Sequence, residues 1–336
     1  MTFFKPTERI RVVVFGGTGS QGLSVVKALA SSEKYVTTVL TRDNKSKNAT
    51  EIATLYGVKL VQGSYTTEEG LRAAFNEQDV AYVNFDSFGI GEPAEYFWTF
   101  RAYEIAIQSG LKLFIYPGAP DRYAQHNFVE DYRNSHNIVA ARLSNWLTNQ
   151  PTERLPWTIL TGGVYASMLN SILRPIKDDD GVTFAVPMAE DSVIPLIPLE
   201  NYGLRIKWIL ENAEEAVGKF VSAAPYHVTF PEIAKAFEKV NGIKASFRPI
   251  TVEQWIEGAS AFIDVDKTLP RGSTSEDPTT FTFRKSFSAW WRLWRDSVED
   301  QERNKEARRW ISAYHPSSPK NIEEWMTVTR YGSQLL

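Results

Sequence analysis

The sequence predicts an α/β fold, a doubly wound parallel sheet of the Rossmann type with a smaller C-terminal substrate lobe. Three observations support this fold class. A glycine-spaced turn follows the first apolar run, strand-like runs alternate with helix-like segments through the first half, and this rhythm loosens after about residue 165. Such alternation is typical of parallel strands whose connecting helices cover both faces of the sheet.

The individual elements follow from hydrophobic periodicity. Strand-like runs stand at 10–15, 35–41, 58–62, 80–85, 112–116 and 157–160. Helix-like segments lie between them at 21–32, 48–56, 67–76 and 95–109. Further on, short apolar runs with prolines cover 182–198. Helices are expected at 201–215 and 231–241, with a strand between them at 220–224. Residues 268–280 have loop composition.

No clean linker divides the two halves of the chain. We therefore expect residues 1–165 to form the Rossmann domain, completed by about residues 200–225. Residues 166–336 are expected to form the smaller lobe, interleaved with the Rossmann part. With 336 residues and 43% hydrophobic content, the chain is long enough for one large or two modest domains.

Composition excludes several classes of function. A formal net charge of −3 argues against a nucleic-acid partner. The absence of cysteine excludes disulfides, thiolate metal sites and cysteine nucleophiles. The 4 histidines contain no pair at ligand spacing, so no metal site is expected. The N-terminus lacks a signal-peptide pattern. The longest uncharged run, 155–173, is broken by proline and glycine and does not predict a membrane-spanning helix. We therefore expect a cytoplasmic protein without a membrane partner.

The turn after the first strand has the spacing of a dinucleotide-binding loop. Gly16, Gly19 and Gly22 would allow a tight turn, a close approach of the backbone to a pyrophosphate, and close packing of helix on strand. The following helix would present free N–H groups to the phosphates. The residues expected to face the ligand stand between the glycines: Thr18, Ser20 and Gln21. The alternative is a purely structural glycine turn.

The end of the second predicted strand bears on the choice of cofactor. Arg42 stands where an arginine suits the 2′-phosphate of NADP(H), and Lys45 and Lys47 add positive charge. Asp43 is the argument for NAD(H), because an acid in this region binds the ribose hydroxyl. We favour NADP(H); the alternative is that these are ordinary solvated loop charges.

Five stretches resemble the NmrA-like proteins, atypical short-chain dehydrogenase/reductases related to isoflavone-reductase-like enzymes. They read VVVFGGTGSQGLSVVKAL, VLTRD, GVKLVQGSYTTEEGLRAAFNEQDVAYVN, GLKLFIYPG and PWTILTGGVYASML. The resemblance covers residues 8–245 and implies a Rossmann fold with a small substrate lobe and NADP(H) as cofactor. It is compatible with reductases of small aromatic or alkaloid-like molecules and with silent sensors of NADP(H), and fungal relatives serve in nitrogen regulation or secondary metabolism.

The same resemblance assigns further contacts by position. The adenosine side should be touched by Gly63, Ser64 and Tyr65, although the family often has an acid where Ser64 stands. The remaining implied cofactor residues are Asn84, Phe85, Tyr116, Pro117, Gly118, Gly162, Gly163, Val164 and Tyr165. Tyr96, Trp98 and Tyr165 are substrate candidates, the first two because ligands bind beyond the carboxyl ends of parallel strands.

Short-chain reductases commonly use a Tyr-x-x-x-Lys pair on one helical face, where the lysine lowers the pKa of the tyrosine. Here Tyr132 and His136 have that spacing, and His136 takes the place of the lysine. One interpretation makes Tyr132 or His136 the acid/base; the other makes Tyr132 a packing residue and His136 a contact to ribose or to a neighbouring helix. Asp121 and His126 stand just before and are weaker candidates.

An aromatic stripe lies near the C-terminus. Its members are Phe287, Trp290, Trp291, Trp294 and Val298. Their helical spacing predicts a helix packed on the smaller lobe, and the alternative is that some of these rings wall a substrate pocket.

The leading hypothesis is an NADP(H)-dependent reductase that transfers hydride to a C=O, C=C or C=N bond of a small aromatic or heterocyclic metabolite. The second is a non-catalytic NADP(H) redox sensor that regulates a protein partner, and the replaced lysine motivates it. The third is a cofactor-bound cyclase of the iminium (Pictet–Spengler) type without net redox.

Overall fold

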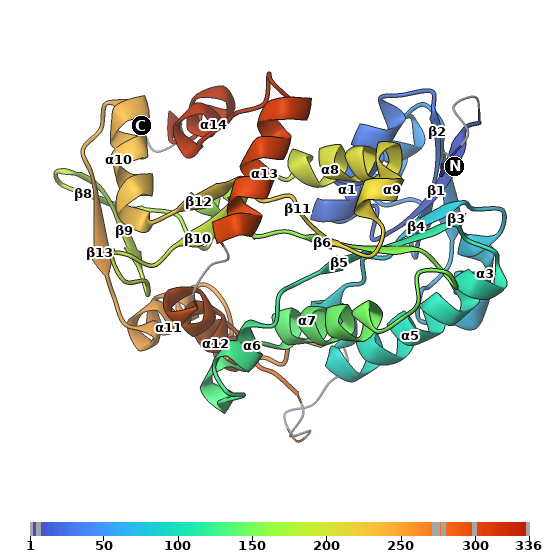
Figure 1. Ribbon diagram of the computed structural model, residues 1–336. Helices are drawn as coiled ribbons and strands as arrows, with labels where there is room; N and C mark the ends of the chain where they lie inside the picture. Colours follow the sequence, from blue (N-terminus) through green and yellow to red (C-terminus); the bar gives the residue numbers. More distant parts are fainter. Residues whose placement is uncertain (1–2, 5–7, 271–275, 277–279, 298–300, 334–336) are drawn as a thin grey trace. The chain divides into compact units, whose positions relative to one another are not determined.

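The computed structural model describes residues 3–4, 8–270, 276, 280–297 and 301–333, with the side chains of 301–304 left aside (Figure 1). The chain divides into two compact units. Unit 1 comprises residues 1–121, 135–161 and 199–221, and unit 2 comprises residues 122–134, 162–198 and 222–336.

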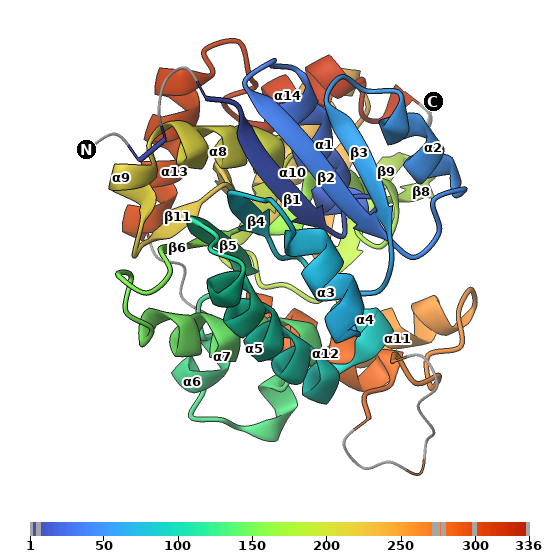
Figure 2. The ribbon, with the colours of Figure 1, turned by 90° about the vertical axis from the view of Figure 1, so that its right-hand side faces the viewer.

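Unit 1 is built on a parallel sheet. Its strands are β1 (Ile10–Phe15), β2 (Tyr35–Thr41), β3 (Val58–Gln62), β4 (Val80–Tyr82), β5 (Leu113–Gly118), β6 (Trp157–Thr161) and β11 (Phe220–Ser222). Their order is β11-β6-β5-β4-β1-β2-β3, and the neighbours from β6 to β3 pair in parallel. Figure 2 shows β4, β1, β2 and β3 side by side. From β1, the strand order runs outward through β2 to β3 on one side and through β4 to β6 on the other. In open sheets of this class, ligands bind at the point between β1 and β4 where the order reverses.

Helices cover both faces of this sheet. They are α1 (Ser20–Ala30), α2 (Lys47–Ala53), α3 (Glu68–Phe75), α4 (Ser87–Ile90), α5 (Glu92–Gln108), α7 (Ser135–Thr148), α8 (Glu200–Glu211) and α9 (Ala213–Ala216). Figure 1 shows α1 and α8 on one face and α5 and α7 on the other. Because both faces are covered, Val12, Val13 and Val14 at the centre of β1 are fully buried.

The contact of α1 with α8 depends on small residues. Gly203 lies so close to α1 that a Cβ atom there would collide with the Ser24 carbonyl oxygen. The Gly203 N–H donates to Ser24 Oγ at 3.1 Å. Residues 199–221 thus complete the helical layer on the face of the sheet that α1 covers.

Unit 2 contains two small sheets of order β12-β10-β7 and β13-β9-β8. The strands are β7 (Val164–Tyr165), β8 (Ile176–Asp178), β9 (Gly181–Val186), β10 (Ile194–Ile197), β12 (Tyr226–Val228) and β13 (Ala245–Pro249). The helices are α6 (Arg122–Gln125), α10 (Phe230–Asn241), α11 (Val252–Ser260), α12 (Phe283–Asp296), α13 (Gln301–Tyr314) and α14 (Ile322–Thr329). Short 3₁₀ helices cover Glu130–Tyr132 and Ala166–Asn170.

The aromatic stripe packs within unit 2. On α12, Trp290, Trp291 and Trp294 are buried, and Trp291 meets the Trp255 ring of α11 at 5.3 Å. Phe287 is half-buried beside them. This supports the packing interpretation for these four rings, while Val298 lies outside the described residues.

Most boundaries agree with the sequence prediction, and the differences have local causes. β4 ends at Tyr82 rather than 85, and the long helix begins at Glu92 rather than 95. The expected helix 201–215 is interrupted at Asn212, whose non-helical φ of −125° separates α8 from α9. Across the described part of the chain, no helix has the length and apolar character needed to cross a bilayer.

Candidate functional site

The glycine loop is formed by close backbone contacts in unit 1. Gly16 has a φ of +67°, a conformation that favours glycine, and a Cβ there would stand 2.7 Å from the Asn84 carbonyl oxygen. A Cβ on Gly22 would collide with the Gly16 carbonyl oxygen. The loop after β1 therefore lies against the residues that follow β4, and two of its three spaced glycines are sterically required.

The N-terminus of α1 is open to an anion. Gly19 is the N-cap, without a side-chain cap, and the first turn contains no acidic residue. Gly19 and Ser20 are exposed and Thr18 is half-buried. Helix N-termini of this kind bind phosphate through backbone N–H groups and the positive end of the helix dipole.

The Gln21 side chain is bound inside unit 1. Its Oε1 accepts a hydrogen bond from the Tyr82 hydroxyl at 3.0 Å, and its Nε2 donates to the Tyr202 hydroxyl at 3.3 Å. These two bonds hold the Gln21 side chain in place beside the loop.

The end of β2 presents a free cation. Arg42 is exposed, and its guanidinium has no hydrogen bond or ion pair among the described residues. Asp43 is engaged locally, since its Oδ1 accepts from the Lys45 N–H at 2.8 Å. Asp43, the argument for NAD(H), therefore uses one carboxylate oxygen to stabilise its own turn, whereas Arg42 remains available to bind a phosphate.

One hydrogen bond joins this region to the glycine loop. Asn48 Nδ2, on α2, donates to the Thr18 carbonyl oxygen at 2.8 Å. The segment that carries Arg42 and the loop that carries Gly19 are thereby fixed relative to each other.

The ends of β3, β4 and β5 supply the other predicted cofactor residues of unit 1. Tyr65 stacks on Phe85 with ring centroids 4.5 Å apart, and Ser64 Oγ bonds Thr66 Oγ1 at 2.7 Å. Gly118 ends β5, where a Cβ would collide with Ser144 Oγ of α7. The structure thus brings Asn84, Phe85, Pro117 and Gly118 to the carboxyl ends of neighbouring strands.

Gly162 and Tyr165 belong to unit 2. Tyr165 ends β7 and pairs with Ile197 of β10. Gly163 packs on Pro195, whose carbonyl oxygen a Cβ would meet. Their assignment to the nicotinamide side stays a prediction.

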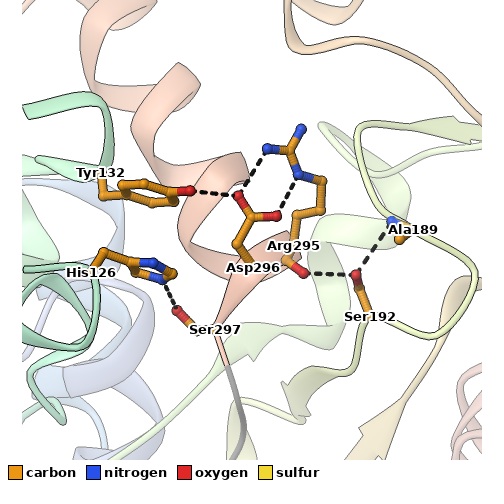
Figure 3. Close-up of polar contacts among 7 residues, drawn as sticks. All are labelled: His126, Tyr132, Ala189, Ser192, Arg295, Asp296 and Ser297. Carbon is orange, nitrogen blue, oxygen red and sulfur yellow. Dashed lines mark hydrogen bonds and ion pairs between the residues drawn. The ribbon is translucent and has the colours of Figure 1, made fainter. Parts of the chain in front are cut away.

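Tyr132 takes part in a polar cluster of unit 2 (Figure 3). Its hydroxyl donates to Asp296 Oδ2 at 2.9 Å, and the His126 ring stacks on it at 3.9 Å. Arg295 donates to both carboxylate oxygens of Asp296, at 2.7 and 2.8 Å. His126 Nε2 bonds Ser297 Oγ at 3.0 Å.

The electrostatics of this cluster oppose proton release from Tyr132. Burial and the hydrogen bond to Asp296 raise the pKa of Tyr132. Arg295 lowers the pKa of Asp296, and burial lowers that of His126. At neutral pH the cluster contains a phenol, a carboxylate, a guanidinium and a neutral imidazole.

The expectation that Tyr132 and His136 share a helical face is wrong. Tyr132 ends a 3₁₀ helix, Arg133 is extended, and α7 begins at Ser135. Asn134 causes the break: it is buried, and its Nδ2 donates to the Ser286 carbonyl oxygen at 2.7 Å.

His136 lies in the first turn of α7 in unit 1. Its ring contacts Phe88 at 4.6 Å, and its buried Nδ1 has no hydrogen-bond partner among the described residues. Burial lowers the pKa of His136 to about 4, so the imidazole is neutral at physiological pH. It cannot supply the positive charge that a lysine would.

The substrate candidates of α5 lie in a charged environment that the sequence did not reveal. The Tyr96 hydroxyl donates to Glu92 at 2.9 Å, and Arg142 of α7 pairs with the same carboxylate at 3.3 Å. Trp98 packs against the core of unit 1. Asp121, a weaker acid/base candidate, accepts a hydrogen bond from Asn145 at 3.1 Å. Glu92 and Glu95 were missed, although two glutamates three residues apart in an apolar helix were a signal.

Comparison with known proteins places this geometry in a family. Residues 8–259 match the NmrA-like family. The NmrA-like family domain-containing oxidoreductase lnaB of Aspergillus flavus is 26% identical over 263 residues, covering 72% of this chain and 76% of the relative.

Solved structures have the same fold. NmrA, described as a negative transcriptional regulator in complex with NADP, superposes with a TM-score of 0.71 at 15% identity, covering 98% of this chain and 100% of that one. The Citrobacter sp. triphenylmethane reductase complexed with NADP(H) gives 0.65 at 15% identity, covering 95% and 99%. With the family match extending from the glycine loop through α11, the chain belongs to the NmrA-like family.

Proposed function

We propose that the protein is an NADP(H)-dependent oxidoreductase that reduces a small aromatic or heterocyclic metabolite at a C=O, C=C or C=N bond. The observation that carries this proposal is the open N-terminus of α1 together with Arg42, which has no ion-pair partner among the described residues; the bond from Asn48 to Thr18 joins the two regions. A relative named as an oxidoreductase and two solved structures with NADP or NADP(H) in their descriptions support it.

The residues of unit 1 fit such a cofactor. Gly22 leaves no room for a side chain between α1 and the loop, so backbone N–H groups can approach a pyrophosphate. Arg42 would hold the 2′-phosphate. The residues proposed to line the rest of the cofactor are Thr18, Ser20, Ser64, Asn84, Phe85, Pro117 and Gly118. When bound, the reduced cofactor supplies hydride.

The proton that accompanies hydride needs a separate source. His136 is neutral at pH 7, and the Tyr132 hydroxyl donates a hydrogen bond to Asp296, which keeps the phenol protonated. We therefore propose that neither residue releases the proton. His136 would accept or donate a hydrogen bond through its unpaired ring nitrogen.

Calorimetric titration with NADPH and NADH tests the cofactor. We expect NADPH to bind at least about tenfold more tightly, a difference of about 1.4 kcal/mol. Arg42→Ala should remove this preference, whereas Lys59→Ala, at an exposed position near the start of β3, should not. Equal binding of both nucleotides by the native protein would contradict the assignment of Arg42.

A redox sensor is the second candidate, because the neutral His136 replaces the lysine of active short-chain reductases. The two candidates differ in whether bound NADPH is consumed. A product two hydrogens heavier than its substrate, formed with NADPH oxidation, would support the reductase. NADPH-dependent binding of a protein partner without oxidation would support the sensor, and a product that requires NADPH yet consumes none would indicate the cyclase.

A further inference from the structure

The buried face of α5 in unit 1 contains an unusual set of polar atoms. Glu95 is 4% exposed and Tyr116, on β5, is 2% exposed. Glu95 Oε2 and the Tyr116 hydroxyl have no hydrogen-bond partner among the described residues, and the same holds for Thr99 Oγ1 one turn further along α5. Buried polar groups are rarely left unpaired, so such a group calls for an explanation in function or hydration.

The charges around Glu95 disfavour its ionised form. Asp86 acts on it from the loop before α4 and Glu92 from its own helix. Arg142 of α7, the cation on this side, pairs with Glu92. Burial, with these acids beside it, raises the pKa of Glu95 to about 8.

Ser87 connects this acid to the proposed site. Its hydroxyl lies close enough to Glu95 to lower the pKa of that acid, and Ser87 opens α4 directly after Asn84, Phe85 and Asp86, the residues that follow β4. The next residue, Phe88, contacts the His136 ring. A hydroxyl can accept one proton while it releases another, so Ser87 can relay a proton from a group that is itself buried.

We propose that Glu95 is the proton store for the proposed reduction: it is a neutral carboxylic acid in the folded protein and delivers its proton through the Ser87 hydroxyl. This proposal rests on the proposed function. When bound, the reduced cofactor would supply hydride to the substrate double bond, which would leave an anion on oxygen, nitrogen or carbon. The Glu95 O–H bond breaks, Ser87 accepts that proton and passes its own to the anion, and water later re-protonates the Glu95 carboxylate.

The first experiment reads the protonation of Glu95 without a substrate. Full-length protein labelled with ¹³C at the glutamate carboxyl carbons is titrated by NMR, with and without NADPH. We expect one carboxyl to titrate near pH 8, to disappear in Glu95→Gln, and to persist in Glu104→Gln, a matched change at an exposed position of α5. Titration of every glutamate below about pH 6 would overturn the proposal.

The second experiment reads the relay. NADPH oxidation is followed with 9,10-phenanthrenequinone as the probe. The turnover number should fall above about pH 8 as Glu95 ionises. Glu95→Gln and Ser87→Ala should lower it by about a hundredfold at pH 7 with unchanged NADPH affinity, and Ser109→Ala, at the exposed end of α5, should match the native protein.

The two experiments separate the proposal from the function on which it rests. A carboxyl that titrates near pH 8 in a protein that never oxidises NADPH would count against the reductase and leave Glu95 as a neutral buried acid. Normal quinone reduction by Glu95→Gln would overturn the proton store and leave the reductase standing.

Discussion

The Tyr132 hydroxyl donates a hydrogen bond of 2.9 Å to Asp296, which lies 164 residues later in the chain (Figure 3). A lysine near a catalytic tyrosine stabilises the phenolate, whereas a carboxylate stabilises the protonated phenol. The partner of Tyr132 is therefore electrostatically opposite to the partner that the Tyr-x-x-x-Lys pattern provides.

This contact predicts a structural role for Tyr132. Tyr132→Phe should lower the free energy of unfolding by about 1 kcal/mol, the usual cost of one hydrogen bond to a partly exposed group. NADPH affinity should not change. Chemical denaturation of Tyr132→Phe, Asp296→Asn and the double variant measures the coupling. A loss of turnover by several orders of magnitude in Tyr132→Phe, with unchanged stability, would instead restore it as the proton donor.

Gly22 should not tolerate even a methyl group. A Cβ there collides with the Gly16 carbonyl oxygen, which belongs to backbone and cannot move aside as a flexible side chain would. We expect Gly22→Ala to cost about 1–3 kcal/mol of stability and to abolish NADPH binding. Gly258→Ala is the matched control, because nothing lies within 4 Å of a Cβ there, and in α11 it should stabilise by up to about 1 kcal/mol. Equal stabilities of the two variants would contradict the close contact.

Glu95 should make stability depend on pH in an identifiable way. Its pKa is raised from 4.5 to about 8 on folding, so the folded protein keeps a proton that the unfolded chain loses. Stability from this group should therefore fall as pH rises from about 4.5 to 8 and level off above, with a slope of at most about 1.4 kcal/mol per pH unit. The measurement is the difference in unfolding free energy between the native protein and Glu95→Gln at several pH values. A constant difference would show that Glu95 titrates normally.

His136 should show the opposite dependence. Its pKa is lowered to about 4, so the unfolded chain binds a proton that the folded protein excludes. The stabilisation should be complete above pH 6.5 and should be lost as pH falls towards 4. The imidazole resonances, assigned by comparison with His136→Gln, should remain those of a neutral ring at pH 6. A ring that is half-protonated at pH 6 would contradict this prediction.

The strand-rich half of the fold could be predicted from the sequence because its signals are local. Apolar runs such as 35–41 and 58–62, and the spacing of Gly16, Gly19 and Gly22, specify strands and a turn without reference to distant residues. Buried parallel strands carry this signal over their full length.

The misplaced and missed residues depend on distant contacts. The start of α7 is displaced by the bond from Asn134 to Ser286, and the partner of Tyr132 is on α12; neither is visible near residue 132. Glu95 is unusual only because α5 places it against β5. Local patterns located the loop that we propose binds the cofactor, whereas the acid–base environment could be seen only in the tertiary structure.

Unit 1 is assembled from three stretches of chain, the last of which is residues 199–221. During synthesis, the helix α1 that follows the glycine loop is made early, but α8, against which Ser24 packs, is made only when the chain has reached residues 200–211. A nascent chain must therefore hold the apolar surface of α1 uncovered until most of the polypeptide has left the ribosome. A chain that ends after residue 165 would lack α8 and β11, so we expect it not to fold as an autonomous nucleotide-binding fragment.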